Sequence, residues 1–235
     1  MVYIRILENF WEAFLLGIGY TLLLSLVGTI VGLVIALVLG VVRSIKTTPQ
    51  TKLSRFLLKG GQALIQLYVT VIRGTPMMVQ AMIFYYVFRR IGLLWTPLEA
   101  GLFTVSVNTG AYLTEVVKNG IESVPKGQEE AAKSLGMNRF KAMSLVILPQ
   151  AIKTQMASIG NEFIINIKDT SVLNDIMISE LYYVAEDAAM RYSSFLEAML
   201  IAAVIYLFLT YTTSKVLKIF ENKLGVKALE IVSSN

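Results

Sequence analysis

Residues 13–42 read AFLLGIGYTLLLSLVGTIVGLVIALVLGVV and contain no charged side chain. A helix needs about 20 mostly apolar residues to cross the hydrocarbon core of a bilayer, and this run is longer than that. Two further uncharged runs occupy residues 74–88 and 198–214. Of the 235 residues, 55% are hydrophobic and only 16% are charged. Soluble domains carry about 25% charged residues, so the chain is predicted to be an all-α membrane protein.

A cleaved signal peptide is the alternative interpretation of the first run. The run is too long for the apolar part of a signal peptide, Glu8 and Glu12 precede it, and further apolar runs follow. We therefore interpret it as a retained helix.

Several chemistries are excluded by the residues that the chain lacks. There is no cysteine and no histidine, which removes disulfides, thiolate nucleophiles, imidazole bases and the usual zinc or copper ligands. No metal site and no enzymatic activity are therefore expected. No G-x-x-x-x-G-K-[ST] run is present, so this chain is not expected to bind a nucleoside triphosphate. The net charge of +5 is typical of basic loops in a membrane protein and does not predict a nucleic-acid partner.

We expect one transmembrane domain over residues 1–235, with spans at about 12–42, 74–90, 98–118, 149–173 and 195–214. In the first span, Gly28 and Gly32 form a small-xxx-small pair, which either admits a close neighbouring helix or only lightens a lipid-facing one. Residues 56–72 are amphipathic and are predicted to be interfacial or re-entrant.

Basic residues predict the orientation. Fifteen of the 21 Lys and Arg residues lie in segments 43–59 and 118–153 and in the tail after Thr213. A five-span arrangement places these three segments on one side, which is the cytoplasmic side by the positive-inside rule. The N-terminus is then outside and the C-terminus is cytoplasmic, with Arg89 and Arg90 as a minority exception.

The polar stretch at about residues 122–148 is the most informative part of the chain. Its centre, Glu130–Ser134, favours a helix that Gly136 would end, and a second short helix is expected to start near Asn138. The result is a helical projection that offers small and apolar side chains to a partner. The side chains concerned are Ala131, Ala132, Leu135 and Phe140.

This stretch resembles the EAA loop of the permease subunits of bacterial ATP-binding-cassette (ABC) importers. The family pattern is Glu-Ala-Ala, three residues, Gly, nine residues, Ile, one residue, Leu-Pro. It is matched in register by Glu130-Ala131-Ala132, Gly136 and Leu148-Pro149, with Val146 in place of the isoleucine. The resemblance implies that this loop docks on a nucleotide-binding subunit and transmits its closure. The implied docking residues are Glu130, Ala131, Ala132, Leu135, Gly136 and Phe140.

Three other segments resemble the permeases for polar amino acids, of the histidine, glutamate, glutamine, arginine and opine type. They are Arg73–Pro76, Asn108–Tyr112, and Gly160–Phe163 with Lys168–Ser171. The resemblance implies a five-helix type I ABC importer fold in the cell membrane and a second permease subunit. It also implies two separate ATPase subunits, which bind ATP and Mg²⁺, and an extracytoplasmic binding protein that delivers the amino acid.

Polar residues within the expected spans are candidates for lining a substrate path. Inserting a charged side chain at the centre of a membrane helix costs about 2.5–3.5 kcal/mol, so such residues usually have a functional role. Glu162, Asn166 and Asp169 share one helix face, and Asn108, Tyr112 and Glu115 repeat that spacing. A structural network or an ion pair of Lys168 is the alternative.

The segment Arg73-Gly74-Thr75-Pro76 interrupts the apolar pattern. Thr75 suits an N-cap and Pro76 a first helical position, so a helix starting there could turn free N–H groups toward a substrate carboxylate. In the alternative, Arg73 reaches the headgroups and Thr75 only caps. The candidate substrate-binding residues are Thr75, Met77, Gln80, Asn108, Glu162 and Asp169.

Together these features favour the permease subunit of an ATP-driven importer for a basic or neutral polar amino acid. An ion-coupled carrier that uses Glu162 or Asp169 as a proton relay is the alternative, and a scaffolding membrane subunit is the third possibility. The docking loop favours the first, since a carrier has no use for it.

Overall fold

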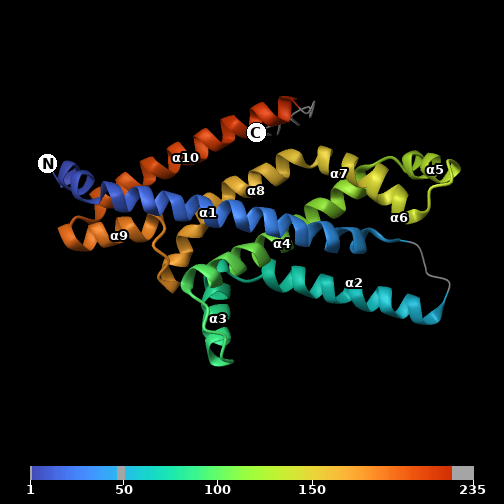
Figure 1. Cartoon of the computed structure of the whole chain (residues 1–235), viewed down its shortest axis with the longest axis horizontal. Helices are drawn as coiled ribbons and strands as arrows, with labels where there is room; N and C mark the ends of the chain where they lie inside the picture. The colour runs from blue at the N-terminus through green and yellow to red at the C-terminus, as the bar shows by residue number, and fades with distance from the viewer. Residues whose placement is uncertain (1, 47–50, 224–235) are drawn as a thin grey trace, which may run out of the picture.

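The computed structural model describes residues 2–46 and 51–223, which contain helices and no strand. Figure 1 shows an elongated molecule with the N-terminus and α9 at one end and α5 and α6 at the other. The helices are α1 (Val2–Ser44), α2 (Lys52–Arg73), α3 (Met77–Arg90), α4 (Pro97–Ser123), α5 (Lys126–Ser134), α6 (Arg139–Ala142), α7 (Leu148–Thr154), α8 (Met156–Asp169), α9 (Leu181–Tyr192) and α10 (Phe195–Lys223). A π-helical turn, Met143–Ile147, joins α6 to α7, and a 3-10 helix, Thr170–Ile176, follows α8.

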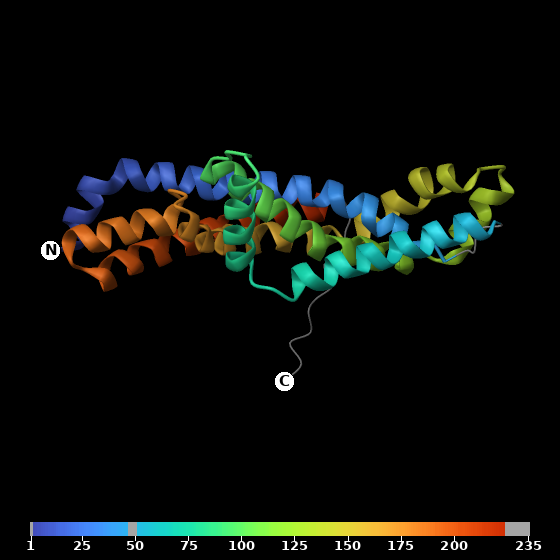
Figure 2. The ribbon, with the colours of Figure 1, turned by 90° about the horizontal axis from the view of Figure 1, so that it is seen from below.

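Within the described residues, α1 and α10 are each long and apolar enough to cross a membrane, while α2 and α3 qualify only as a pair bent by 110°. The expected span 74–90 coincides with α3, which does not qualify by itself, so a separate crossing there stays a prediction. Helix α3 has 14 residues, about 21 Å at 1.5 Å per residue, which is shorter than a hydrocarbon core of about 30 Å. Figures 1 and 2 both show α3 standing across the long axis of the molecule.

The expected spans 98–118 and 149–173 coincide with helical segments whose ends differ from prediction. Helix α4 starts with a capping box between Thr96 and Glu99 and continues to Ser123. The fourth segment starts at Arg139 instead of Pro149 and is interrupted at Gln155. Because proline cannot donate a backbone hydrogen bond, the π-helical turn directly before α7 carries the chain into Pro149 without ending the helix.

Helices α1 and α4 pack closely along their lengths. A Cβ atom at Gly28 would lie 2.3 Å from Cγ1 of Val105, and one at Gly32 would lie 2.8 Å from Cγ2 of Thr109. Gly40 meets Val117 in the same way, at 2.7 Å. Of the two alternatives that the sequence left open for Gly28 and Gly32, the structure shows the close approach of a neighbouring helix, because only a missing side chain allows these backbones to come so near.

Residues 56–72, predicted to be interfacial or re-entrant, lie in the regular helix α2. Gln62 Nε2 donates to the carbonyls of Val42 and Ile45 at the end of α1, at 3.1 and 3.0 Å. Tyr68 donates from its hydroxyl to the Val107 carbonyl of α4 at 2.6 Å. These bonds hold α2 alongside the second half of α1, so that α2 ends near the middle of the molecule (Figure 1).

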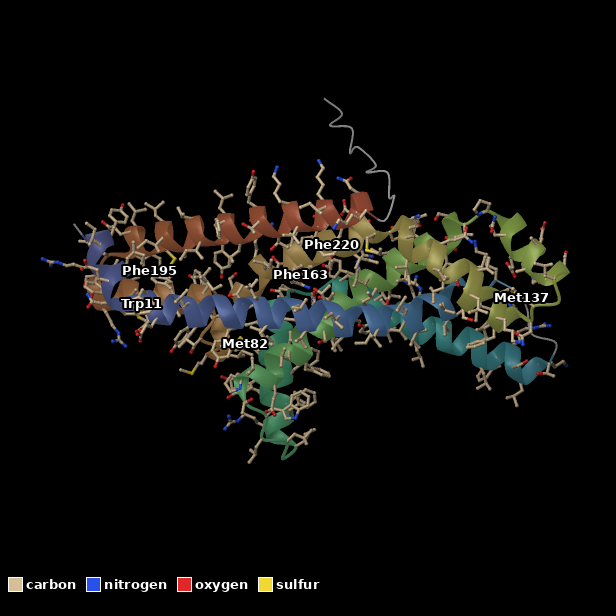
Figure 3. The ribbon with its side chains drawn as sticks, turned by 45° about the horizontal axis from the view of Figure 1, so that its top comes forward. Trp11, Met82, Met137, Phe163, Phe195 and Phe220 are labelled. Atoms are coloured by element: carbon tan, nitrogen blue, oxygen red, sulfur yellow. The ribbon has the colours of Figure 1, made fainter. Side chains whose placement is uncertain are left out.

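The first half of α1 packs with α9 and α10 in a separate apolar cluster that includes Phe10, Phe14, Leu181 and Ala198. Figure 3 shows Trp11 and Phe195 at this end and Met137, between α5 and α6, at the other. The two halves of α1 therefore pack against different neighbours, at opposite ends of the molecule. Lys227, the last residue of the predicted basic tail, lies outside the described residues.

Candidate functional site

The junction of α2 and α3 is held by Gln80, whose side chain is only 4% exposed. Its Nε2 donates to the Ile72 carbonyl at 2.7 Å and to the carbonyl and Oγ1 of Thr75 at 2.9 and 2.8 Å. Its Oε1 accepts from Nδ2 of Asn108 at 3.0 Å. Because the amide of Gln80 is saturated by protein groups, it fixes the junction and the position of α4 relative to it.

Thr75 does not cap α3, contrary to the sequence prediction. Its hydroxyl donates back to the Val71 carbonyl at 2.8 Å, and Pro76 occupies the N-cap position without a side-chain cap. Met77, the first residue of α3, packs partly buried against the apolar cluster around Leu24. Of the candidates near this junction, the structure brings Thr75, Gln80 and Asn108 together through hydrogen bonds and turns Met77 toward the core.

The polar face of α8 separates into a buried and an accessible part. Asn166 is 2% exposed, and its Nδ2 donates to Oγ1 of both Thr29 and Thr109 at 2.9 Å. Asn166 therefore belongs to the structural network that was the alternative to a substrate role. Glu162 is partly buried and Asp169 is exposed at the end of α8, so their carboxylates are the accessible acids of this face.

The contacts of two further charged residues bear on their roles. Glu115, which shares the spacing of Asn108 and Tyr112 on α4, forms an ion pair with Arg43 of α1. Arg43 also donates to Gln66 of α2, so one guanidinium joins three helices. Lys168 forms no ion pair within the described part of the chain.

Arg73 and Tyr112 form a pair that the candidate residues did not include. The Arg73 guanidinium carbon lies 5.1 Å from the centre of the Tyr112 ring, a cation–π distance. The Arg73 side chain therefore lies against α4. The sequence signal that could have singled out Arg73 is its position as the one charged residue between Lys59 and Arg89.

The projection between α4 and α7 has the predicted form. Gly136 has a φ of +79°, and the N–H groups of Gly136 and Met137 donate to the carbonyls of Lys133 and Ala132 at 2.9 and 3.1 Å. This pair of bonds is a Schellman ending, which explains why glycine stands there. Asn138 caps α6 by accepting from the Lys141 N–H at 2.9 Å.

The side chains of this projection divide into exposed and buried ones. Leu135 and Phe140 are each 80% exposed, and Glu130, Ala131 and Gly136 are exposed as well. Ala132 is only 3% exposed, so it packs inside the projection and, unlike the others, does not offer its side chain at the surface. Large exposed apolar side chains beside exposed charges are typical of a docking surface.

A cavity of about 340 Å³ lies behind this projection, where the ends of α1 and α4 meet α5 and α6. Its lining carries charges of both signs. Lys46 lies 3.0 Å from Glu122, and this contact lowers the pKa of the Glu122 carboxyl below its ordinary value. Glu129 pairs with Lys133 within α5 at 2.6 Å. Among the described residues, no group of His, Cys, Asp and Glu side chains could hold a metal ion.

The helical arrangement and its projecting loop define a class of protein, the membrane components of solute importers. Residues 55–226 match the family described as the binding-protein-dependent transport system inner membrane component, and the chain belongs to this family. The L-cystine transport system permease TcyB of Bacillus subtilis is 33% identical over 218 residues, covering 92% of this chain and 88% of that protein. The glutamine transport system permease GlnP of Escherichia coli K12 is 34% identical over 161 residues, covering 68% of this chain and 74% of that protein.

Solved structures show the same architecture. A chain of an amino acid ABC transporter crystallised with histidines superposes with a TM-score of 0.79 at 31% identity, covering 92% of this chain and 96% of that chain. A chain of the inward-facing MetNI methionine ABC transporter superposes with a TM-score of 0.76 at 16% identity, covering 92% and 98%. The predicted type I ABC importer fold is confirmed. Together with the family, it supports an importer permease over an ion-coupled carrier.

Proposed function

We propose that this chain forms the translocation path of an ATP-driven importer for a basic or neutral polar amino acid. The observation that carries the proposal is the projection of α5 and α6, which presents Leu135 and Phe140 at 80% exposure at the end of the molecule opposite the N-terminus (Figure 1). A chain that only relays protons has no need of such a surface, whereas a chain moved by a partner's ATP hydrolysis needs a rigid lever.

The partners follow from this assignment. Two ATPase subunits would bind ATP and Mg²⁺ and dock on the projection, a second permease subunit would complete the path, and an extracytoplasmic binding protein would deliver the amino acid. The projection then lies in the cytoplasm, the N-terminus lies outside and the C-terminus lies inside, as the basic segments predict. The relatives named for cystine and glutamine transport support a polar amino acid as the substrate.

The path would be lined where α2, α4 and α8 meet. Glu162 and Asp169 offer negative charge to an ammonium or a cationic side chain, and Asn108 lies nearby at the Gln80 junction. Thr75 and Met77 lie at the start of α3 beside this region. Glu162→Gln and Asp169→Asn are expected to reduce substrate-stimulated transport without loss of assembly.

Uptake by proteoliposomes that contain this chain, its ATPase subunits and its binding protein tests the proposal. With the membrane potential and proton gradient collapsed, ATP should drive uptake of L-glutamine, L-arginine or L-cystine, while a non-hydrolysable analogue should not. Uptake that needs the gradient and ignores ATP would establish the ion-coupled carrier instead.

The docking surface has its own test. Phe140→Ala should lower co-purification of the ATPase subunits, because large apolar side chains at a docking centre contribute most of its affinity. Phe208→Ala is the control, since Phe208 of α10 is similarly exposed, at 66%, but lies far from the projection. Equal recovery of the ATPase subunits with both variants would show that the surface is misassigned.

A further inference from the structure

The Arg73 guanidinium is at the end of α2 and lies over the ring of Tyr112, 5.1 Å from its centre. Tyr112 lies between Thr109 and Val117 of α4, whose neighbours on α1 are Gly32 and Gly40. The pair is therefore level with the uncharged part of α1. A cation at that depth is costly and marks a functional position by default.

Apart from its contact with Tyr112, the Arg73 side chain makes no hydrogen bond or ion pair within the described part of the chain. The guanidinium has five N–H donors in a planar fork that fits a carboxylate with two parallel bonds. Stacking on an aromatic ring fixes the plane of that fork and leaves its edge free. The planar face of the Arg73 guanidinium is thus held by the Tyr112 ring, and its N–H donors make no hydrogen bond within the described residues.

The pair of Arg73 and Tyr112 lies beside the part of α8 that carries Glu162. Asn166 of α8 is hydrogen-bonded to Thr109 of α4, and Gly120 of α4 lies against Gln155, directly before α8, so the two helices run antiparallel. Tyr112, one turn after Thr109, is therefore level with Glu162, one turn before Asn166, and Arg73 acts electrostatically on the Glu162 carboxylate. Glu162 is partly buried, and Arg73 and Asp169 are exposed on the surface of the single chain. Lys168 is the cation that acts on Asp169, and none of Arg73, Glu162 and Asp169 takes part in an ion pair among the described residues.

The other polar groups at the junction are already engaged. Thr75 donates to Val71, and Gln80 is saturated by the junction and by Asn108. Binding of a substrate carboxylate at the start of α3, as considered from the sequence, would have to use backbone N–H groups alone. Arg73 offers a full charge and a matching geometry at the same place.

We propose that Arg73, oriented by Tyr112, binds the α-carboxylate of a zwitterionic amino acid whose ammonium group is bound by Glu162 and Asp169. The inference rests on the proposed function and adds to it the residue that selects α-amino acids over amines. Cationic and neutral side chains are both compatible with this contact, because it recognises the part that all amino acids share.

Binding of matched ligands to the complex of this permease with its ATPase subunits, in nanodiscs and without the binding protein, tests the inference. The probes are L-glutamine with 4-aminobutanamide and L-arginine with agmatine, pairs that differ by one α-carboxylate. The wild-type complex should bind at least one amino acid about tenfold or more tightly than its amine, as the loss of a charged, bidentate contact implies. Arg73→Met should weaken binding of that amino acid about tenfold and leave the amine unchanged. The affinity of the Arg73→Lys complex for that amino acid should fall between those of the wild-type and Arg73→Met complexes, because lysine keeps the charge and loses the planar fork of donors.

Arg89→Met is the matched control. The Arg89 guanidinium carbon lies 5.3 Å from the ring centre of Tyr85, so this substitution removes a cation–π contact outside the proposed site. The Arg89→Met complex should prefer the amino acid over its amine as strongly as the wild-type complex does. The inference is overturned if the Arg73→Met complex keeps the wild-type preference for the amino acid over its amine. It is also overturned if Arg73→Met weakens binding of the amino acid and of the amine by the same factor. Co-purification of the ATPase subunits and the thermal unfolding midpoint show whether Arg73→Met is folded, and Arg73→Lys supplies the decision if it is not.

Glu162→Gln separates this inference from the function on which it rests. It should weaken binding of both members of a pair, since both carry the ammonium group, and leave their ratio unchanged. If Glu162→Gln has this effect while Arg73→Met keeps the preference, the substrate site stands and the role of Arg73 is wrong. If the wild-type complex binds none of the four probes, or neither substitution changes binding, the substrate site itself is wrong.

Discussion

Asn166 of α8 donates a hydrogen bond of 2.9 Å from its Nδ2 to Oγ1 of Thr29 in α1, a residue 137 positions away. The same amide donates to Thr109 of α4, also at 2.9 Å. One buried side chain therefore joins three helices of the path at a single level. This network sets the depth at which the neighbouring residues of α8, including Glu162, face the space beside α2.

Removing the Asn166 amide should loosen this three-helix contact. Asn166→Ala is expected to lower the free energy of unfolding by about 1–2 kcal/mol, because interhelical hydrogen bonds in membranes contribute about 0.6–1.7 kcal/mol each. Thermal unfolding in detergent measures the change. Asn161→Ala on the same helix is the control, because Asn161 is exposed and its replacement should leave the midpoint unchanged. Equal unfolding midpoints for the two variants would show that the hydrogen bonds of Asn166 do not contribute to stability.

The contact of Gly28 with Val105 predicts a repairable clash. Gly28→Ala places a Cβ where 2.3 Å separates it from Cγ1 of Val105, and overpacking of this kind costs about 1–3 kcal/mol. Val105→Ala in the same chain should recover part of that loss, which a double-mutant cycle of thermal stability detects. Gly19→Ala is the control, because no atom lies within 4 Å of a Cβ at Gly19. Strictly additive effects of the two substitutions would show that the clash with Val105 is not the cause of the loss.

The buried carboxylate of Glu180 should be essential for the start of α9. It is 0% exposed and accepts from the N–H groups of Tyr182 and Tyr183 at 3.0 and 2.8 Å and from the Tyr206 hydroxyl at 2.8 Å. Glu180→Ala leaves these three donors without their acceptor and is expected to cost about 2–4 kcal/mol. Tyr206→Phe removes a single donor and should cost about 1 kcal/mol. The order of the two unfolding midpoints checks this, and the reverse order would show that the cap contributes little.

Gly136 should matter for transmission more than for folding. Its φ of +79° disfavours residues with a Cβ by about 1–2 kcal/mol, so Gly136→Ala should misplace α5 relative to α6. We expect ATP hydrolysis by the assembled importer to continue while uptake per ATP falls. Gly127→Ala, in an open position of α5 with no atom within 4 Å of its Cβ, should keep the wild-type ratio. Normal coupling in the Gly136→Ala importer would show that the Schellman ending has no part in transmission.

The sequence alone determined the membrane class, the projecting loop and the approximate position of the long helices. These features depend on residues that are close together in the sequence. A run of thirty uncharged residues is long and apolar enough to cross a bilayer. Gly136 and Asn138 make their hydrogen bonds with backbone groups a few residues away. For Gly28 and Gly32 the spacing of small residues indicated a possible close approach, and only the packing of α1 on α4 decided it against a lipid-facing position.

The tertiary structure decided which polar residues are free to meet a ligand. Spacing placed Asn166 on one face with Glu162 and Asp169, yet two threonines from distant helices engage only Asn166. Likewise the bend of 110° after Arg73 and its stacking on Tyr112 depend on α4 being present beside α2. Hydrogen-bond partners and aromatic contacts arise from helices brought together across the chain, and no local pattern in the sequence specifies which of those partners a side chain will find.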